Sequence, residues 1–317
     1  MATPTSFADT VTRFHFERAA VRGAVVSLDD AGREILAQHA YPPALRRALA
    51  ELLAAAALLA SALAFKGTLI VQLQGTGPVT LLVVECTADL GLRATAQWRD
   101  TATTLPEDAS LRALAGDPAT SRLAIMLDPK DGGPVYQGIV ALEATSIAEL
   151  IQHYLTTSEQ IDSRLALATD GATTRGILLQ RMPSAGAEDD ATWRHAAAGT
   201  DIDRAALLGA GSVEALLTAR FPTDDIRVMK GRALRFHCAC SKERVSNALR
   251  MLGRAEIESI LAEQGIVGVT CEFCGRSYSF VASDALALFT QGGPGADASP
   301  ELDPKGGAGV NGGGSSN

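Results

Sequence analysis

The sequence predicts an α+β fold with a strand-rich N-terminal domain, a helical linker and a small C-terminal domain that holds four cysteines. Short strand-like runs separated by turn residues dominate the chain up to residue 183, with two helical stretches among them. Short helical patterns follow, and the four cysteines come after them as two close pairs. With 317 residues, 47% of them apolar, the chain is long enough for about two domains.

The N-terminal domain is predicted to span residues 10–183 and to be α/β-sandwich-like. Glycine-containing turns such as Gly75-Thr76-Gly77-Pro78 join successive strands and predict hairpins and a meander. The predicted strands are 13–18, 24–28, 68–74, 79–85, 92–98, 123–127, 136–142, 165–169 and 174–179.

A long helix is predicted from about residue 44 to 64, after Pro43 and before the stop signal Lys66-Gly67. Its second half is almost wholly apolar over fourteen residues, Leu52–Phe65. That length is too short to span a bilayer, which takes about 20 residues. We therefore expect a buried core helix.

A second helix is predicted at about residues 146–160. Ser146 and Glu149 have the spacing of a capping box, and the apolar residues that follow recur at helical spacing. His153 lies beside this apolar stripe and is interpreted as a structural residue rather than a ligand.

Residues 184–236 are predicted to form a helical, metastable linker. A stretch of small and acidic residues is followed by helical patterns at about 190–198, 203–208 and 213–220. Helices shorter than about 12–15 residues are marginal without tertiary packing. Such a segment could be folded when docked and unfolded when released. A plain helical connector is the alternative, and the pattern alone favours it.

Four of the five cysteines form the pairs Cys238 with Cys240 and Cys271 with Cys274. Four sulfur ligands are the tetrahedral set that suits a structural Zn²⁺. The one-residue gap in the first pair is unusual, because zinc signatures commonly use two-residue gaps. Four ordinary buried thiols are the alternative, which the tight pairing disfavours. The sequence therefore predicts one Zn²⁺ per chain, held by these four cysteines.

The zinc-binding domain is predicted to span residues 237–290 and to be α+β. Strand-like runs at 267–270 and 277–280 flank the second pair, which places it at the tip of a hairpin. The predicted helices are 241–253, 255–264 and 283–289. Residues 291–317 are mostly Gly, Ser, Pro and Asp, and this composition predicts a disordered tail.

A shell of four thiolates leaves no position for a water nucleophile, whereas a catalytic zinc usually keeps one position open. We therefore predict no catalytic residues and no enzyme activity. His237 adjoins Cys238 but should point to the opposite face of an extended run, so it is not expected to be a ligand.

Two roles stay open for the site, a structural clip or a redox switch. Structural sites are the more common class. A Cys238–Cys240 disulfide would close a very small ring, and strained disulfides are labile. The short gap therefore favours the switch.

The net charge of −8 opposes a general nucleic-acid or membrane-surface role. Residues 1–10 lack the pattern of a signal peptide, and paired thiols suit a reducing cytoplasm. We find no Walker phosphate loop and no complete GxGxxG motif, so ATP binding is not expected. Cys86 has no partner in sequence and is interpreted as a core thiol.

Three stretches of the sequence match motifs of a known family. They are Phe236-His237-Cys238-Ala239-Cys240-Ser241-Lys242-Glu243-Arg244-Val245 with Cys271-Glu272-Phe273-Cys274 and Tyr278-Ser279-Phe280; Tyr136-Gln137-Gly138-Ile139-Val140 with His153-Tyr154-Leu155 and Ser158-Glu159-Gln160; and Gly176-Ile177-Leu178-Leu179-Gln180. Over about residues 10–290 the chain resembles the redox-regulated 33 kDa chaperonin family of heat-shock holdases. Cys86 and the tail lie outside the pattern.

The resemblance implies a reduced, inactive form in which Cys238, Cys240, Cys271 and Cys274 hold zinc. Oxidation would pair Cys238 with Cys240 and Cys271 with Cys274, expel the zinc, and unfold the zinc domain and the linker. The exposed surfaces would then hold unfolding client proteins without ATP under oxidative stress, and the active form would tend to be a homodimer.

Two other functions are considered. A zinc-ribbon nucleic-acid module is one, because basic residues gather around the first pair: Arg227, Lys230, Arg232, Arg235, Lys242, Arg244, Arg250 and Arg254. A thiol oxidoreductase that uses Cys271 and Cys274 is the other. Such a CxxC normally opens a helix, which lowers the pKa of the first thiol, and here strands flank it.

Overall fold

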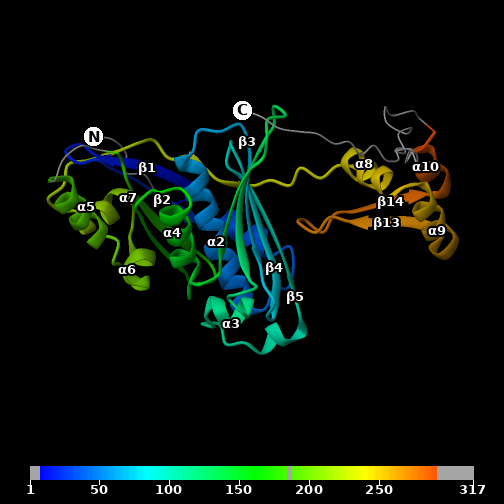
Figure 1. Ribbon diagram of the computed structural model, residues 1–317, viewed down its shortest axis with the longest axis horizontal. Coiled ribbons are helices and arrows are strands. Elements are labelled where there is room, and N and C mark those ends of the chain that lie inside the picture. Colours follow the sequence, from blue (N-terminus) through cyan, green and yellow to red (C-terminus); the bar gives the residue numbers. More distant parts are fainter. Residues whose placement is uncertain (1–7, 184–187, 291–317) are drawn as a thin grey trace, which may run out of the picture. The chain divides into compact units, whose positions relative to one another are not determined.

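The computed structural model describes residues 8–183 and 188–290 (Figure 1). The fold is α+β, as predicted from the sequence. The chain divides into two compact units. Residues up to Cys240 together with Thr270–Arg276 form the first unit, and Ser241–Val269 with the chain from Ser277 onward form the second. The predicted disordered tail, residues 291–317, lies outside the described residues.

Within the described residues, the first unit is framed by two six-stranded sheets. The first sheet has the order β10-β1-β2-β9-β8, and β11 also pairs with β1. Its strands are β1 Thr10–Phe16, β2 Val21–Leu28, β8 Ser163–Thr169, β9 Thr174–Arg181, β10 Ile226–Val228 and β11 Arg232–Ala233.

The second sheet has the order β12-β5-β4-β3-β6-β7. Its strands are β3 Gly67–Gln74, β4 Val79–Thr87, β5 Gly91–Trp98, β6 Arg122–Pro129, β7 Tyr136–Ala141 and β12 Arg235–Phe236. Its members pair antiparallel except for β12, which runs parallel to β5. The predicted meander of β3, β4 and β5 is confirmed.

Helix α2, Pro43–Ala62, lies between the two sheets (Figure 1). Its leucines and alanines are buried around most of its circumference, and residues of both sheets share one core with it. Small alanine side chains let the strands approach the helix closely, because interiors are packed to near-crystalline density. The predicted buried helix is confirmed. No helix in the described part of the chain is long and apolar enough to cross a membrane.

The prediction of only two helices in this domain is wrong. Helices α1, Asp30–Leu36, and α3, Leu111–Ala115, and a 3₁₀ turn at Asp100–Thr104 also form. Each is too short to be stable alone. They exist because side chains such as Ile35 and Leu111 are buried in the core.

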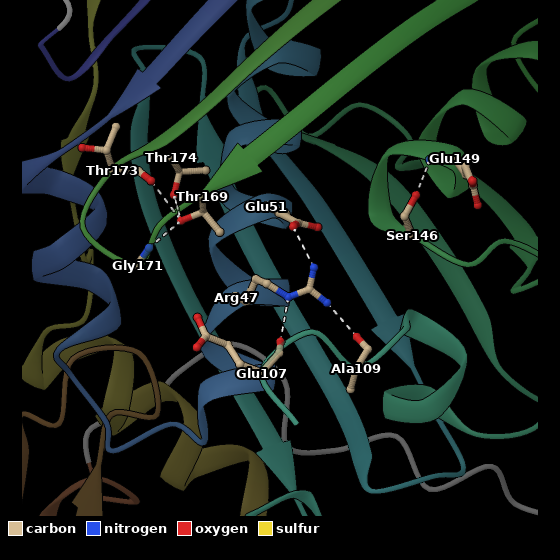
Figure 2. A network of polar contacts seen from close by, with 10 residues as sticks. All are labelled: Arg47, Glu51, Glu107, Ala109, Ser146, Glu149, Thr169, Gly171, Thr173 and Thr174. Atoms are coloured by element: carbon tan, nitrogen blue, oxygen red, sulfur yellow. Dashed lines mark hydrogen bonds and ion pairs between the residues drawn. The ribbon is translucent and has the colours of Figure 1, made fainter. Parts of the chain in front are cut away.

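Polar contacts from α2 hold the connection that leads to α3 (Figure 2). Arg47 donates from Nε to the carbonyl of Glu107 at 2.9 Å and from Nη2 to that of Ala109 at 2.6 Å. Its Nη1 pairs with Glu51 at 3.3 Å. Burial raises the pKa of the Glu51 carboxyl, and the charge of Arg47 partly opposes that rise.

Helix α4, Ile147–Thr157, begins at the predicted cap. Ser146 Oγ accepts a hydrogen bond from the amide of Glu149 at 3.2 Å (Figure 2). The Glu149 carboxylate accepts from the amide and hydroxyl of Thr145, at 2.9 and 2.6 Å. These bonds lower the pKa of Glu149.

Three helices cover the face of the first sheet that points away from α2: α5 Glu188–Ala198, α6 Arg204–Gly209 and α7 Val213–Arg220 (Figure 1). Successive residues of a strand point to opposite faces. In β2, Ala24 and Val26 therefore face α2, whereas Val21 and Val25 join a second core with Trp193. Strands β1 and β2 begin at residues 10 and 21, earlier than predicted, because this pairing extends along both.

The second unit consists of two helices, a hairpin and a last short helix. Its elements are α8 Lys242–Leu252, α9 Arg254–Gln264, β13 Ile266–Thr270, β14 Ser277–Val281 and α10 Ala282–Ala287. Ser241, where a helix was predicted to begin, caps α8 by accepting from the amide of Arg244. Gly265 ends α9 with φ +74°, a conformation that favours glycine. The core is small: Leu249, Ile257, Val267, Phe280 and Ala285.

Candidate metal centre

The structure brings the four predicted cysteines together. The sulfur atoms of Cys238, Cys240, Cys271 and Cys274 lie within 4.8 Å of one another, and each side chain is half-buried. The sulfur of Cys238 lies 3.7 Å from that of Cys271, and the sulfur of Cys240 lies 3.4 Å from that of Cys274. All five cysteines of the chain are thiols in this structure.

Local structure explains how each pair is presented. The extended run that contains β12 leads into Cys238, and the amide of His237 donates to the carbonyl of Leu92 at 2.9 Å. The second pair forms the tip of the β13–β14 hairpin, as predicted. There the amide of Gly275 donates to the carbonyl of Cys271 at 2.8 Å, and Gly275 has φ +64°. The turn therefore needs glycine after Cys274.

The arrangement fits a tetrahedral metal ion. Zinc–sulfur bonds of about 2.3 Å place the sulfurs of a tetrahedron about 3.8 Å apart. The distances of 3.4 and 3.7 Å are close to that value, and the other sulfurs lie within reach of the same centre. The four cysteines could hold such an ion and would supply all four ligands of its tetrahedral shell.

Electrostatics also favours a cation at this place. Burial raises the pKa of the Cys271 thiol, and it raises that of Cys274 to about 12, where neighbouring sulfurs add to the rise. Four thiolates so close together would repel one another. A bound divalent cation reverses this effect and keeps its ligands deprotonated.

Arg93, on β5, lies against the cluster. Its Nη1 donates to the sulfur of Cys238 at 3.7 Å, and its guanidinium lies 4.0 Å from the ring centre of Phe273. Its Nη2 pairs with Glu85 at 2.6 Å. Burial acts to lower the pKa of Arg93, but Glu85 and then Cys238 raise it by more. Arg93 is thus a charged support for the metal centre.

A second support comes from the region before α2, where His39 Nε2 lies 2.7 Å from the carbonyl oxygen of Glu272. Sequence reasoning missed both His39 and Arg93. Arg93 is 145 positions from Cys238, and no local pattern links residues so far apart. His237 does not join the group of close ligand atoms, in line with its expected orientation.

Cys86 lies apart from the centre, on β4. It is fully buried in the core around α2, and burial raises the pKa of its thiol to about 12. Its sulfur donates to the carbonyl of Thr87 at 3.6 Å. The interpretation of Cys86 as a core thiol is confirmed.

Comparison with known proteins adds the family. The sequence profile described as Hsp33 protein matches residues 9–281. The chain belongs to the Hsp33 family. Its relatives in this family include the 33 kDa chaperonin of Methylobacillus flagellatus, 44% identical over 284 residues, which cover 89% of this chain and 94% of the relative. The 33 kDa chaperonin of Chromobacterium violaceum is 41% identical over 282 residues, with 89% and 94% covered.

The Hsp33 fold is also found among solved structures. The crystal structure of the 33 kDa chaperonin (heat shock protein 33 homolog) from Thermotoga maritima superposes with a TM-score of 0.76 at 20% identity. The match covers 89% of this chain and 98% of the other. At this identity the likeness shows a shared fold.

Proposed function

We propose that the protein is a redox-regulated, ATP-independent holdase of the cytoplasm that binds unfolding proteins under oxidative stress. Its relatives carry the name 33 kDa chaperonin, which supports a chaperone role. The observation that carries the redox part is the cluster of four cysteine sulfurs within 4.8 Å.

In the reduced state, Cys238, Cys240, Cys271 and Cys274 would hold one Zn²⁺. The position of the four cysteines along the chain links this site to the folding of the second unit. Cys240 is the last residue before the second unit, and the hairpin tip lies between two segments of that unit. The bound ion supplies a cross-link between the two passages of the chain.

The second unit needs such a cross-link. It has 43 described residues and five fully buried core side chains. Domains of about 40 residues usually depend on disulfides or metals. A structural zinc site contributes on the order of 10–16 kcal/mol of folding free energy.

Oxidation would remove the ligands. In each pair, two thiolates give two electrons to one peroxide molecule, form one S–S bond, and yield two waters after uptake of two protons. We propose Cys238–Cys240 and Cys271–Cys274 as the pairs. Cysteines joined in this way no longer offer thiolates, so the second unit loses its cross-link and unfolds.

Unfolding of the second unit would then spread into the linker, residues 184–236. This linker ends at residue 236, two residues before Cys238, and its helices α5, α6 and α7 are held by packing on the first sheet. Undocking would uncover apolar side chains of that sheet, among them Phe14, Phe16 and Val21. Such a surface suits unfolding clients or a second copy of the chain, so we propose a homodimer as the active form.

The proposal is tested on one set of samples before and after peroxide treatment with mild heat. Zinc and thiol content, circular dichroism and suppression of client aggregation are measured together. We expect about one zinc lost and four thiols consumed per chain, with loss of helical signal and gain of protection. Equal protection by the reduced and the oxidised, zinc-free protein would refute the proposal.

The alternatives have less support. Of the eight basic residues near the first pair, four form ion pairs: Arg227 with Glu17, Arg235 with Asp89, Lys242 with Asp284, and Arg254 with Glu258. This pairing weakens the case for a nucleic-acid surface. Cys271 and Cys274 lie in a hairpin turn rather than at the start of a helix, which disfavours an oxidoreductase.

A further inference from the structure

A pocket of about 210 Å³ lies where the C-terminal end of α2 meets the first sheet. The polar and flexible side chains in its lining are Arg13, His15, Arg22, Ser61, Gln180 and Met229. The pocket contains none of the four cysteines of the metal centre. Its lining also includes Phe14 of β1, and Met229 belongs to the linker.

The charged lining comes from the face of the sheet that otherwise packs on α2. Residues of this face farther along the strands are apolar, for example Val11, Val26 and Leu28. Past the end of α2, the same face carries Arg13 on β1 and Arg22 on β2. Arg13 is exposed there and Arg22 is half-buried, and burying the charge of Arg22 is costly unless something balances it.

Register brings these two arginines together. Arg13 pairs across the sheet with Ala24, and His15 pairs with Arg22, so Arg13 and Arg22 are diagonal neighbours. Long side chains at diagonal positions reach each other. Burial lowers the pKa of the Arg22 guanidinium, and the charge of Arg13 lowers it further. The two positive charges therefore face the same space.

No carboxylate lines this pocket among the described residues. Glu159 lines a second pocket with Arg22 and Gln180, but its carboxylate accepts from the hydroxyls of Tyr136 and Tyr154. Within the described residues, neither Arg13 nor Arg22 forms an ion pair. Glu17, nearby on the chain, pairs instead with His15 and Arg227. Arg22 donates from Nε to Gln180 Oε1 at 3.0 Å, and no other hydrogen bond of its side chain occurs in this part of the structure.

Gln180 supplies a further donor. It is 3% exposed, and it lies opposite Arg22 across β2 and β9. Its amide oxygen accepts from Arg22, so its amide nitrogen is left to donate, and it has no acceptor among the described residues. Gln180 lines the pocket together with Arg22, so this nitrogen is the group of Gln180 that a ligand could engage there.

The partial negative charge at the C-terminal end of α2 accounts for only part of the positive charge of Arg13 and Arg22. The C-terminus of a helix carries a partial negative charge of about half a unit, which attracts cations. Two full charges exceed that. Moreover, neither arginine donates to a carbonyl of the last turn of α2 within the described residues, where Ser61 Oγ donates to Leu58.

We propose that this pocket binds a small oxyanion of the phosphate class, with Arg13, Arg22 and the Gln180 amide as its donors. The anion is either free phosphate or the phosphoryl group of a nucleotide. Guanidinium groups suit such anions because their N–H groups match pairs of oxygens.

The test is calorimetric titration of the reduced, zinc-loaded full chain at constant ionic strength. The probes are inorganic phosphate, pyrophosphate and adenosine monophosphate. We expect saturable binding with one site per chain. Arg13→Gln and Arg22→Gln should each weaken binding by about tenfold or more, since each removes a charge-assisted hydrogen bond. Equal binding of phosphate and the nucleotide assigns the free anion, and tighter nucleotide binding assigns the phosphoryl group.

Arg112→Gln is the matched control, because Arg112 is an exposed arginine of α3 that does not line this pocket. Its binding should equal that of the unaltered chain. The Arg13 variant keeps the test decisive if Arg22→Gln fails to fold, because Arg13 is exposed and its side chain loses no ion pair that the described residues make. Absence of saturable binding by all three probes, or equal weakening by Arg112→Gln, would overturn the proposal.

Discussion

At the scale of single residues, the four clustered cysteines and Cys86 have different surroundings and different roles, although all five are thiols. Cys86, on β4, is enclosed by core side chains and is not one of the four cysteines that come together. The other four are half-buried and mutually close. Burial alone makes a thiol inert, whereas proximity to other sulfurs makes it a ligand.

Under the proposed function, Cys274→Ser should abolish stoichiometric zinc binding and unfold the second unit, whose core is small. Zinc content and far-ultraviolet circular dichroism measure both effects. Cys86→Ala is the matched control. It should cost about 1–2 kcal/mol of unfolding free energy through a small cavity and leave zinc content unchanged. Full zinc retention in Cys274→Ser would contradict the assignment.

Arg93 contacts Cys238 and Phe273 at the cysteine site, and an ion pair with Glu85 holds its guanidinium there. Loss of a residue that supports metal ligands typically weakens metal binding by about 10–100-fold. Arg93→Gln should thus lower zinc affinity by about tenfold in a chelator competition.

Arg47→Gln is the control for that experiment. Arg47 is comparably buried and also pairs with a glutamate, Glu51, but it contacts the connection before α3 rather than the cysteines. It should reduce stability without changing zinc affinity. If both variants lost zinc equally, Arg93 would have no specific role.

At the scale of elements, the linker helices are short segments stabilised by their caps and by the sheet beneath them. Ser212 Oγ accepts from the amide of Ala215 at 3.1 Å at the start of α7. Ser146 does the same for α4 in the sandwich. The two caps are chemically alike, but they belong to segments that we expect to unfold at different stages.

Ser212→Ala should cost about 1 kcal/mol in linker docking and make activation by peroxide faster. Ser146→Ala should cost a similar amount of global unfolding free energy and leave the activation rate unchanged. Hydrogen exchange resolved along the chain, together with activation kinetics, separates the two effects. Equal acceleration by both variants would show that α7 does not control release.

The end of the linker is tied to the β4–β5 turn by Asp89, which pairs with Arg235 and accepts from the hydroxyl of Thr87. The Thr87 hydroxyl and then Arg235 lower the pKa of Asp89 from 3.8 to about 2. A carboxyl whose pKa is lowered by folding stabilises the fold above its ordinary pKa. This contribution is complete above about pH 4 and is lost as pH falls through about 2.

Carboxyl-carbon NMR can follow that titration directly. In Arg235→Gln the pKa of Asp89 should rise toward 3.8, with the Thr87 hydroxyl still holding it below that value. An unchanged pKa would show that the Arg235 contact does not form in solution.

At the scale of the whole molecule, Trp193 reports the proposed release. It is 7% exposed and packs in the second core with Phe16 and Phe221. The other tryptophan, Trp98, lies on β5 beside Tyr41, in the sandwich. Undocking of the linker should bring Trp193 into water and leave Trp98 in place.

In Trp98→Phe, peroxide with mild heat should therefore shift the emission to longer wavelength as zinc leaves. In the complementary Trp193→Phe variant, the emission of Trp98 should change little under the same treatment. A shift of equal size from Trp98 would mean that the sandwich unfolds as well, against the proposal.

The elements of the fold could be predicted wherever a pattern within a short stretch of sequence specifies them. The alternation of residues in β3 and β4, the apolar run of α2 and the cap of α8 are each contained within a few turns or strand residues. Helices α1 and α3 were missed because they are too short for a periodic pattern and form through burial of their side chains.

The sequence alone predicted the four cysteines that meet in the structure, because sulfur donors in two close pairs are a chemical signal that needs no geometry. It also determined the α+β character of the chain. Tertiary structure alone decided that Arg93 and His39 lie at the metal centre, that the linker helices close a second core, and that two arginines share a pocket at the end of α2. Those contacts join residues far apart along the chain, and sheet pairing and packing, rather than local propensity, bring them together.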